Sequence, residues 1–342
     1  MDANELKARI ASGRTEGCYL FAGEEDYLKK HYLSALRDSI VADETLAAFN
    51  HALFEGTDLS FAALRDAIKA PPVFAERKLV EWRYPSFDKM KESELTLFEE
   101  TLELLAEHSY TTLAIIVADG GVELGAGKRE SKFEKRFRDK LSLLVFNKST
   151  DAQLMSWLKR HFDSYRVGVS ADVLRELIFR SGHSMSVLSS EVDKLAFAAL
   201  ARGKDSVSVQ DVRDIASSTP ECDTFALSNA ILDRNKAAAF AAMEEMKLRR
   251  LDPLVILGMM AKSYSELVNV MMLEADGLGS ADIASTLGMN PYRLKLFLGA
   301  SSRFSRERAS RILSELVRVD TEAKFGGVTG YTAIELFISK CV

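Results

Sequence analysis

Two uninterrupted apolar runs do most to limit what this chain can fold into. They read TLAIIVA at 112–118 and LSLLVF at 141–146. A strand with one wet face alternates apolar and polar residues, whereas short continuous runs are typical of strands covered on both faces of a parallel sheet. We therefore expect both runs to be central strands. Three further apolar runs precede them, CYLFA at 18–22, FNHALF at 49–54 and KLVEW at 78–82. Helical patterns separate the runs, which predicts an α/β domain with a mainly parallel sheet.

The pattern changes after Asn147, where strand signals end and helix follows helix to the C-terminus. A length of 342 residues favours two or three domains. A cluster of turn and cap residues, SSTPECD at 217–223, marks a second boundary. The predicted organisation is α/β followed by all-α: an α/β domain at 1–148, a small helical domain at 149–217 and a helical C-terminal domain at 218–342.

Several helix starts and one core stripe can be assigned within the all-α part. Candidate N-caps are Ser170, Ser184 and Ser208. A long apolar stripe follows LDP at 251–253 and consists of Leu257, Met260, Tyr264, Leu267 and Met271.

Composition argues for a soluble globular protein. The chain is 47% hydrophobic and 28% charged, with a formal net charge of -5, so any contact with nucleic acid would be a local patch. Cys18, Cys222 and Cys341 lie far apart, which argues against a zinc knuckle or a disulfide framework and fits a reducing cytoplasm. The N-terminus has no signal-peptide pattern, and we find no apolar stretch long enough to cross a membrane. We expect a cytoplasmic protein without cofactor or metal.

The loop after the first apolar run has the position of a phosphate-binding loop but not its residues. Gly23 is followed by Glu24, Glu25 and Asp26, and a Gly-Lys-Ser/Thr step is missing. These acids suit a helix N-terminus but would repel a triphosphate. A metal site is the less favoured alternative, because successive helical positions do not converge on one ion. A Gly-Lys step within ELGAGKRE at 123–130 lacks the required hydroxyl residue and glycine spacing.

An apolar pair follows a helix that must stop abruptly. Residues 59–70, LSFAALRDAIKA, read as an amphipathic helix, and Pro71-Pro72 ends it because neither proline donates a backbone hydrogen bond. Val73 and Phe74 then lie on a stiff turn. Two interpretations are open: Phe74 packs the helix end onto the core, or it anchors a partner protein.

A second candidate site lies in ADIASTLGMNPYRLKLFL at 281–298, which resembles a helix-turn-helix. Its second helix offers Tyr292, Arg293 and Lys295, a small set for reading bases. A DNA-binding regulator and plain helix packing are the alternatives. Basic residues elsewhere are candidates for DNA or subunit contact, although ordinary solvated faces are favoured. They are Arg249, Arg250, Arg303 and Arg306.

The order of motifs along the chain resembles the bacterial DNA polymerase III delta subunit family, the clamp-opening member of the replicative clamp loader. The motifs that carry the resemblance are YLFAGEEDYL at 19–28, FNHALFEG at 49–56, APPVFAERKLV at 70–80, TLAIIVAD at 112–119, GHSMSVLSSEVDKL at 182–195 and LDPLVILGMMAKSY at 251–264. The similarity covers essentially the whole length.

The resemblance implies an AAA+-like domain with a degenerate loop that does not bind ATP, a helical lid and a C-terminal collar domain. In that family the residues matching Val73 and Phe74 insert into the beta sliding clamp, although Val73 is smaller than the residue often found there. The implied partners are the clamp, the tau/gamma ATPase subunits, delta prime and primer-template DNA. The chain would not be an enzyme by itself but a subunit of a DNA-directed DNA polymerase, a nucleotidyltransferase at the level of the complex. An active AAA+ ATPase is the less favoured alternative.

Overall fold

The computed structural model describes residues 1–41, 44–56, 59–125, 129–325, 327–328 and 330–342. The chain forms two compact units, Met1–Thr150, the α/β unit, and Asp151–Val342, the helical unit. The Gly-Lys step that was discounted as a phosphate loop lies at 127–128, outside the described residues. The boundary near 217 within the helical unit stays a prediction.

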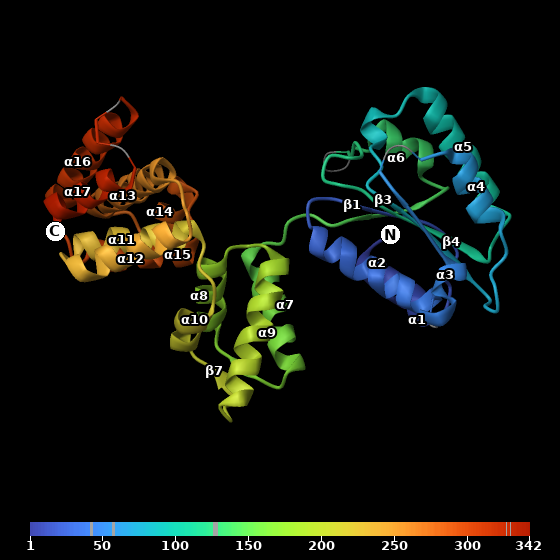
Figure 1. Ribbon diagram of the computed structural model, residues 1–342, viewed down its shortest axis with the longest axis horizontal. Helices are drawn as coiled ribbons and strands as arrows, with labels where there is room; N and C mark the ends of the chain where they lie inside the picture. Colours follow the sequence, from blue (N-terminus) through green and yellow to red (C-terminus); the bar gives the residue numbers. More distant parts are fainter. Residues whose placement is uncertain (42–43, 57–58, 126–128, 326, 329) are drawn as a thin grey trace. The chain divides into compact units, whose positions relative to one another are not determined.

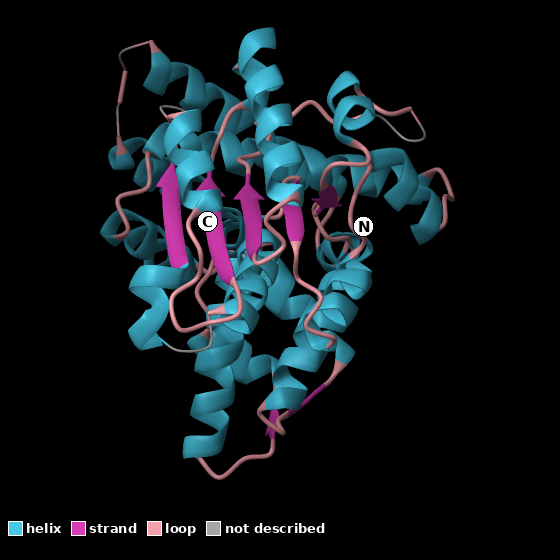
Figure 2. Ribbon diagram, turned by 90° about the vertical axis from the view of Figure 1, so that its right-hand side faces the viewer, coloured by secondary structure: helices cyan, strands magenta, loops and turns pink. Residues whose placement is uncertain are grey.

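The α/β unit contains a five-stranded sheet in the order β2-β3-β4-β1-β5. Every neighbouring pair is parallel, as the continuous apolar runs predict. Figure 2 shows the strands side by side as magenta arrows. The strands are β1 (Gly17–Ala22), β2 (His51–Glu55), β3 (Lys78–Arg83), β4 (Thr111–Ile116) and β5 (Ser142–Val145).

Helices cover both faces of this sheet, because its strands carry apolar side chains on each side. In β1, Tyr19 and Phe21 belong to the core formed with α1 and α2, whereas Cys18 and Leu20 belong to the core formed with α4, α5 and α6. The helices are α1 (Ala3–Ala11), α2 (Asp26–Ile40), α3 (Ala47–Asn50), α4 (Phe61–Lys69), α5 (Glu92–Ala106) and α6 (Lys132–Phe137), with 3-10 turns η1 (Glu44–Leu46) and η2 (Phe87–Lys89) (Figure 1).

Two details of the predicted strands are wrong. The run in β5 was expected to be a central strand, but β5 lies at the edge of the sheet and Val145 is 41% exposed. A continuous apolar run shows that both faces of a strand are covered, and it does not show whether a neighbour pairs with each edge. The run at 49–54 begins as helix rather than strand, so Phe49 and Asn50 lie in α3.

The helical unit is built from eleven helices and one small parallel pair, β6 (Gly168–Val169) with β7 (Ser206–Val207), among its described residues. The predicted caps are confirmed: Ser170, Ser184 and Ser208 each accept a hydrogen bond in the first turn of a helix. The helices are α7 (Asp151–Ser164), α8 (Ala171–Ser181), α9 (Met185–Ala201), α10 (Val209–Ile215), α11 (Pro220–Leu232), α12 (Lys236–Leu248), α13 (Pro253–Ala275), α14 (Ser280–Leu287), α15 (Pro291–Ser301), α16 (Arg306–Lys324) and α17 (Tyr331–Cys341).

The long helix α13 forms the centre of the helical unit. Asp252 caps it, and all five residues of the predicted stripe are buried. By length and composition, α13 is also the one described helix that could cross a membrane, which the sequence reading did not anticipate. Most of its eight buried residues belong to the core of this unit. A core helix can have the same length and composition as a membrane-spanning helix.

A buried carboxylate joins β3 to the edge strand β2. Glu81 is fully buried, its Oε2 lies 2.9 Å from His51 Nε2, and its Oε1 accepts from Arg83 Nε. Burial alone would raise the pKa of Glu81, but the hydrogen bonds and charges of His51 and Arg83 hold it below its usual value of 4.5.

This network predicts acid sensitivity of the α/β unit. A carboxyl whose pKa is lower in the folded state stabilises the fold above its unfolded pKa and loses that contribution as pH falls. We expect wild type to lose unfolding free energy below pH 4.5 more steeply than Glu81→Gln. The measurement is urea unfolding followed by Trp82 fluorescence in a Trp157→Phe background. Parallel pH profiles for the two proteins would contradict the assignment.

Candidate functional site

The end of α4 is held in place by two side chains at the start of β4. Thr111 Oγ1 donates to Ile68 O over 2.9 Å, and Tyr110 Oη donates to Lys69 O over 2.7 Å. The next residue, Ala70, has φ -59° and ψ 128°, the extended conformation that a following proline imposes. The chain therefore leaves α4 at a defined point and in a defined direction.

The turn beyond the prolines is fixed by a buried side-chain amide. Asn50 is only 2% exposed, and its amide brackets the backbone of Val73. Nδ2 donates to Val73 O and Oδ1 accepts from Val73 N, both over 2.8 Å. Sequence reasoning missed Asn50. The available signal was a single amide inside an otherwise apolar run, but its partner lies 23 residues away.

Phe74 projects from this fixed turn. It is 91% exposed, the highest value among the large hydrophobic residues described, while Val73 is half-buried. Its φ is +52°, a left-handed conformation that a bulky residue rarely adopts and that costs about 1–2 kcal/mol. Phe74 does not pack the helix end onto the core.

The loop at Gly23 is pressed against the end of β5. Gly23 has φ +99°, and a Cβ there would lie 2.3 Å from Phe146 O. The same carbonyl accepts from Glu25 N over 2.9 Å. Because α2 begins at Asp26, only three residues separate β1 from the helix. This short loop leaves no ring of free N–H groups of the kind that holds a phosphate.

A buried ammonium occupies the carboxyl edge of the sheet beside this loop. The side chain of Lys29 is fully buried, and its Nζ donates to Gly23 O over 2.7 Å and to Val117 O over 2.8 Å. The third partner is Asp26 Oδ1, also at 2.8 Å. Gly23 follows β1 and Val117 follows β4, so Lys29 closes the edge at which open parallel sheets usually bind ligands. Sequence reasoning did not identify this lysine.

The acids of the loop are separately accounted for. Glu24 pairs with Lys148 at 3.2 Å, and burial raises the pKa of Glu25. Within the described part of the chain, no group of three or more His, Cys, Asp or Glu could hold a metal ion. Glu24 therefore has a cationic partner just before the start of α2.

The segment that resembles a helix-turn-helix uses its second helix for internal packing. Gly288 makes the turn with φ +58°. Tyr292 Oη donates to Glu176 Oε2 and Arg293 Nη2 donates to Glu266 Oε2, both over 2.6 Å. Leu294 and Phe297 are buried. Since two of the three proposed base-reading side chains are bonded to carboxylates, this helix is poorly suited to enter a DNA groove.

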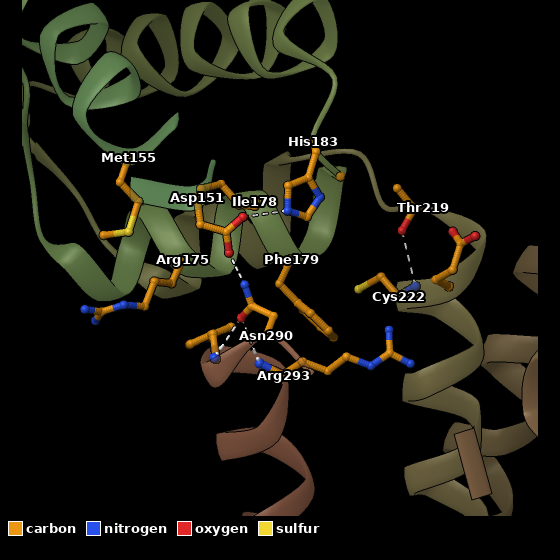
Figure 3. A pocket seen from close by; sticks show the side chains of 13 residues that line it. Asp151, Met155, Arg175, Ile178, Phe179, His183, Thr219, Cys222, Asn290 and Arg293 are labelled. Atoms are coloured by element: carbon orange, nitrogen blue, oxygen red, sulfur yellow. Dashed lines mark hydrogen bonds and ion pairs between the residues drawn. The ribbon is translucent and has the colours of Figure 1, made fainter. Parts of the chain in front are cut away.

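A cavity of about 290 Å³ lies beside the start of α15. Figure 3 shows Asp151 directed toward both His183 and Asn290. Asp151 Oδ1 lies 2.8 Å from His183 Nε2, and Asp151 Oδ2 accepts from Asn290 Nδ2. Asn290 Oδ1 in turn accepts from Tyr292 N over 2.8 Å. Asp151 therefore connects α7, the turn before α9 and the N-cap of α15.

The four arginines identified from the sequence form two groups, one with ion-pair partners and one without them among the described residues. Arg249 donates to Ser218 O over 2.8 Å and pairs with Asp223, and Arg303 lies 3.3 Å from Asp233. Arg250 and Arg306 are exposed and form no ion pair among the described residues. Arg249 and Arg303 therefore have structural partners within the helical unit.

Comparison with known proteins identifies matches along most of the chain. The family model for DNA polymerase III, delta subunit, matches residues 19–120, and the model for the DNA polymerase III delta subunit, C-terminal domain, matches residues 221–341. The Bacillus subtilis DNA polymerase III subunit delta is 21% identical over 332 residues, covering 96% of this chain and 94% of that protein. A probable DNA polymerase III subunit delta of Aquifex aeolicus is 21% identical over 316 residues, covering 90% and 86%.

One solved structure supports the fold over its full length. The Bacillus subtilis DNA clamp loader delta protein superposes with a TM-score of 0.58 at 19% identity, covering 99% of this chain and 98% of that one. The expected class, an α/β domain with a parallel sheet followed by an all-α part, is confirmed.

Replacing Lys29 tests the closed edge of the sheet. Lys29→Met leaves two buried carbonyls without a donor, so we expect the unfolding free energy of the α/β unit to fall by about 2–4 kcal/mol. The matched control is Lys30→Met, which changes an exposed neighbour and should stay within about 0.5 kcal/mol of wild type. Equal urea midpoints for the two variants would argue against the structural role of Lys29.

Replacing Asn50 tests the fixed turn. Asn50→Ala removes both hydrogen bonds to Val73, and we expect a loss of about 1–3 kcal/mol together with faster amide hydrogen exchange at Val73. Asn50→Asp keeps the acceptor but places a buried carboxylate oxygen against Val73 O, so it should destabilise the fold at least as much as Asn50→Ala. Unchanged exchange in Asn50→Ala would show that the prolines alone hold the turn.

Proposed function

Because this chain belongs to the DNA polymerase III delta subunit family, we propose that it binds the beta sliding clamp through the Val73–Phe74 turn and opens one interface of that ring. The observation that carries the proposal is Phe74, an aromatic side chain that is 91% exposed on a turn fixed from behind by Asn50. The Phe74 side chain lies almost entirely outside the core, and its backbone has an unfavourable left-handed conformation.

The turn has the properties of an interface anchor. Burying a phenylalanine stabilises a complex by roughly 2–3 kcal/mol, and a few such residues commonly carry most of an interface's binding energy. A fixed turn loses little conformational entropy on binding, so more of that energy appears as affinity. Val73 is half-buried, so its contribution is the smaller of the two.

Anchoring alone does not open a ring. A binding protein shifts an equilibrium only by the difference between its affinities for the two states. The proposed opening therefore requires that the α/β unit binds the distorted, open clamp interface more tightly than the closed one. In this mechanism the chain selects a conformation of its partner and catalyses no reaction itself.

The closed loop at Gly23 supports a role without nucleotide. Lys29 occupies the sheet edge with its own acceptors, and Glu25 N is bonded to Phe146 O. In the proposed complex, ATP is hydrolysed by the tau/gamma subunits, which assemble with this chain and delta prime. The helical unit would supply a lid at 149–217 and a collar at 218–342. Primer-template DNA would be bound within the complex, in the bacterial cytoplasm.

Calorimetry with the sliding clamp of the same organism tests this proposal. We expect wild type to bind and Phe74→Ala to lose at least about tenfold in affinity. Because Phe74 is almost fully exposed, the variant should unfold at the temperature of wild type. ATP titrated separately should give no binding heat. Absence of clamp binding by folded wild type would refute the proposal, and ATP binding would refute the closed nucleotide site.

A further inference from the structure

We propose that the clamp-docking surface has a second aromatic anchor, Phe49, held beside the Val73–Phe74 turn by Asn50. This inference rests on the proposed function and adds the part of the surface that the turn cannot provide. Phe49 is 65% exposed although it directly precedes Asn50, which is 2% exposed. The chain thus places one apolar side chain outside and the next residue, a polar one, inside.

Asn50 brings the two phenylalanines near each other. Phe49 and Phe74 are the chain neighbours of Asn50 and Val73, which share two hydrogen bonds. Bond lengths along this path place the Cα atoms of Phe49 and Phe74 no more than about 16 Å apart. Figure 1 shows the loop that leaves α4 passing close to α3, which contains Phe49.

The Val73–Phe74 turn alone is too small to provide the area that a specific interface buries. One phenylalanine buries about 150–250 Å², whereas a standard interface buries about 800 Å² on each partner. A patch of that size is roughly 30 Å across, so a footprint centred on Phe74 reaches Phe49. Phe74 and Val73 alone would leave most of the interface unassigned.

No other apolar residue described in the α/β unit is equally available. Phe49 and Phe74 are its two large hydrophobic residues that are more than half exposed. The remaining exposed ones range from 37% to 45% and are Leu53, Tyr84, Leu97 and Val145. Of these, Leu53 lies nearest in the chain, on the edge strand β2 that begins immediately after Asn50.

The occupant that fits this surface is the same clamp molecule that receives Phe74. Phe49 and Phe74 belong to segments that are joined by the hydrogen bonds of the Asn50 side-chain amide. A partner bound to the turn therefore also covers the surface next to Phe49. Simultaneous burial of two rigid aromatic residues is typical of a central cluster in a protein interface. A second copy of this chain is the competing occupant and is an outcome of the test.

Clamp calorimetry with single substitutions tests the inference. We expect Phe49→Ala to weaken binding by about fivefold to tenfold. Phe197→Ala serves as the matched control, because Phe197 is 59% exposed but lies in the helical unit, and it should bind as wild type does. Thermal unfolding of each variant checks that the fold is retained. In a separate measurement, Phe49→Trp in a Trp82→Phe, Trp157→Phe background should show a blue shift of fluorescence when clamp is added.

The outcomes separate this inference from the proposed function. If Phe74→Ala abolishes binding while Phe49→Ala binds within twofold of wild type, the second anchor is refuted and the docking turn stands. If folded wild type does not bind the clamp, both fall. If sedimentation shows a homodimer that Phe49→Ala dissociates, with clamp affinity unchanged, Phe49 serves self-association and the inference is overturned.

Discussion

The buried ammonium of Lys29 determines how the carboxyl edge of the sheet can be used. Its three donors are matched by two backbone carbonyls and one carboxylate, which is the condition under which a buried charge is tolerated. The two carbonyls belong to Gly23 and Val117, which follow the adjacent strands β1 and β4. A parallel sheet normally leaves this edge open to ligands. Here the protein places its own buried ammonium at that edge, paired with the exposed Asp26.

The two large apolar residues of the α/β unit that are more than half exposed are Phe49, in the short helix α3, and Phe74, in the turn after α4. The turn after α4 and the short helix α3 are joined by one side-chain amide, because Asn50 bonds to both backbone groups of Val73. The same physical device serves both regions: a single buried polar side chain satisfies backbone groups that no strand or helix pairs. Beside Gly23 the result is a sheet edge that is occupied by the Lys29 ammonium. At Val73 it is a fixed turn from which Phe74 projects. A chain built in this way is suited to act through protein contacts.

Sequence reasoning recovered what depends on local pattern. Apolar runs located the five strands, Pro71 and Pro72 located the end of α4, and the three serine caps located helix starts. These features depend on residues close together in the chain.

Three of the misses depend on residues or strands that are distant in the chain. Lys29 reaches Val117, 88 residues away, and Asn50 reaches Val73, 23 residues away, so neither lysine nor amide has a local signature for its role. The edge position of β5 likewise depends on strand order rather than on its own residues. Phe74 was identified as a candidate, but only the fold shows that its side chain points to solvent rather than to the core.

The backbone of Phe74 places two selective pressures in opposition. Glycine or asparagine adopts a φ of +52° with less strain than phenylalanine, so drift toward a more stable fold would replace the aromatic ring. Under the proposed clamp binding, loss of the aromatic residue at this position is penalised by weaker binding rather than by unfolding. In a library of substitutions at position 74, variants ranked by cellular abundance and variants ranked by replication fitness would therefore stand in different orders.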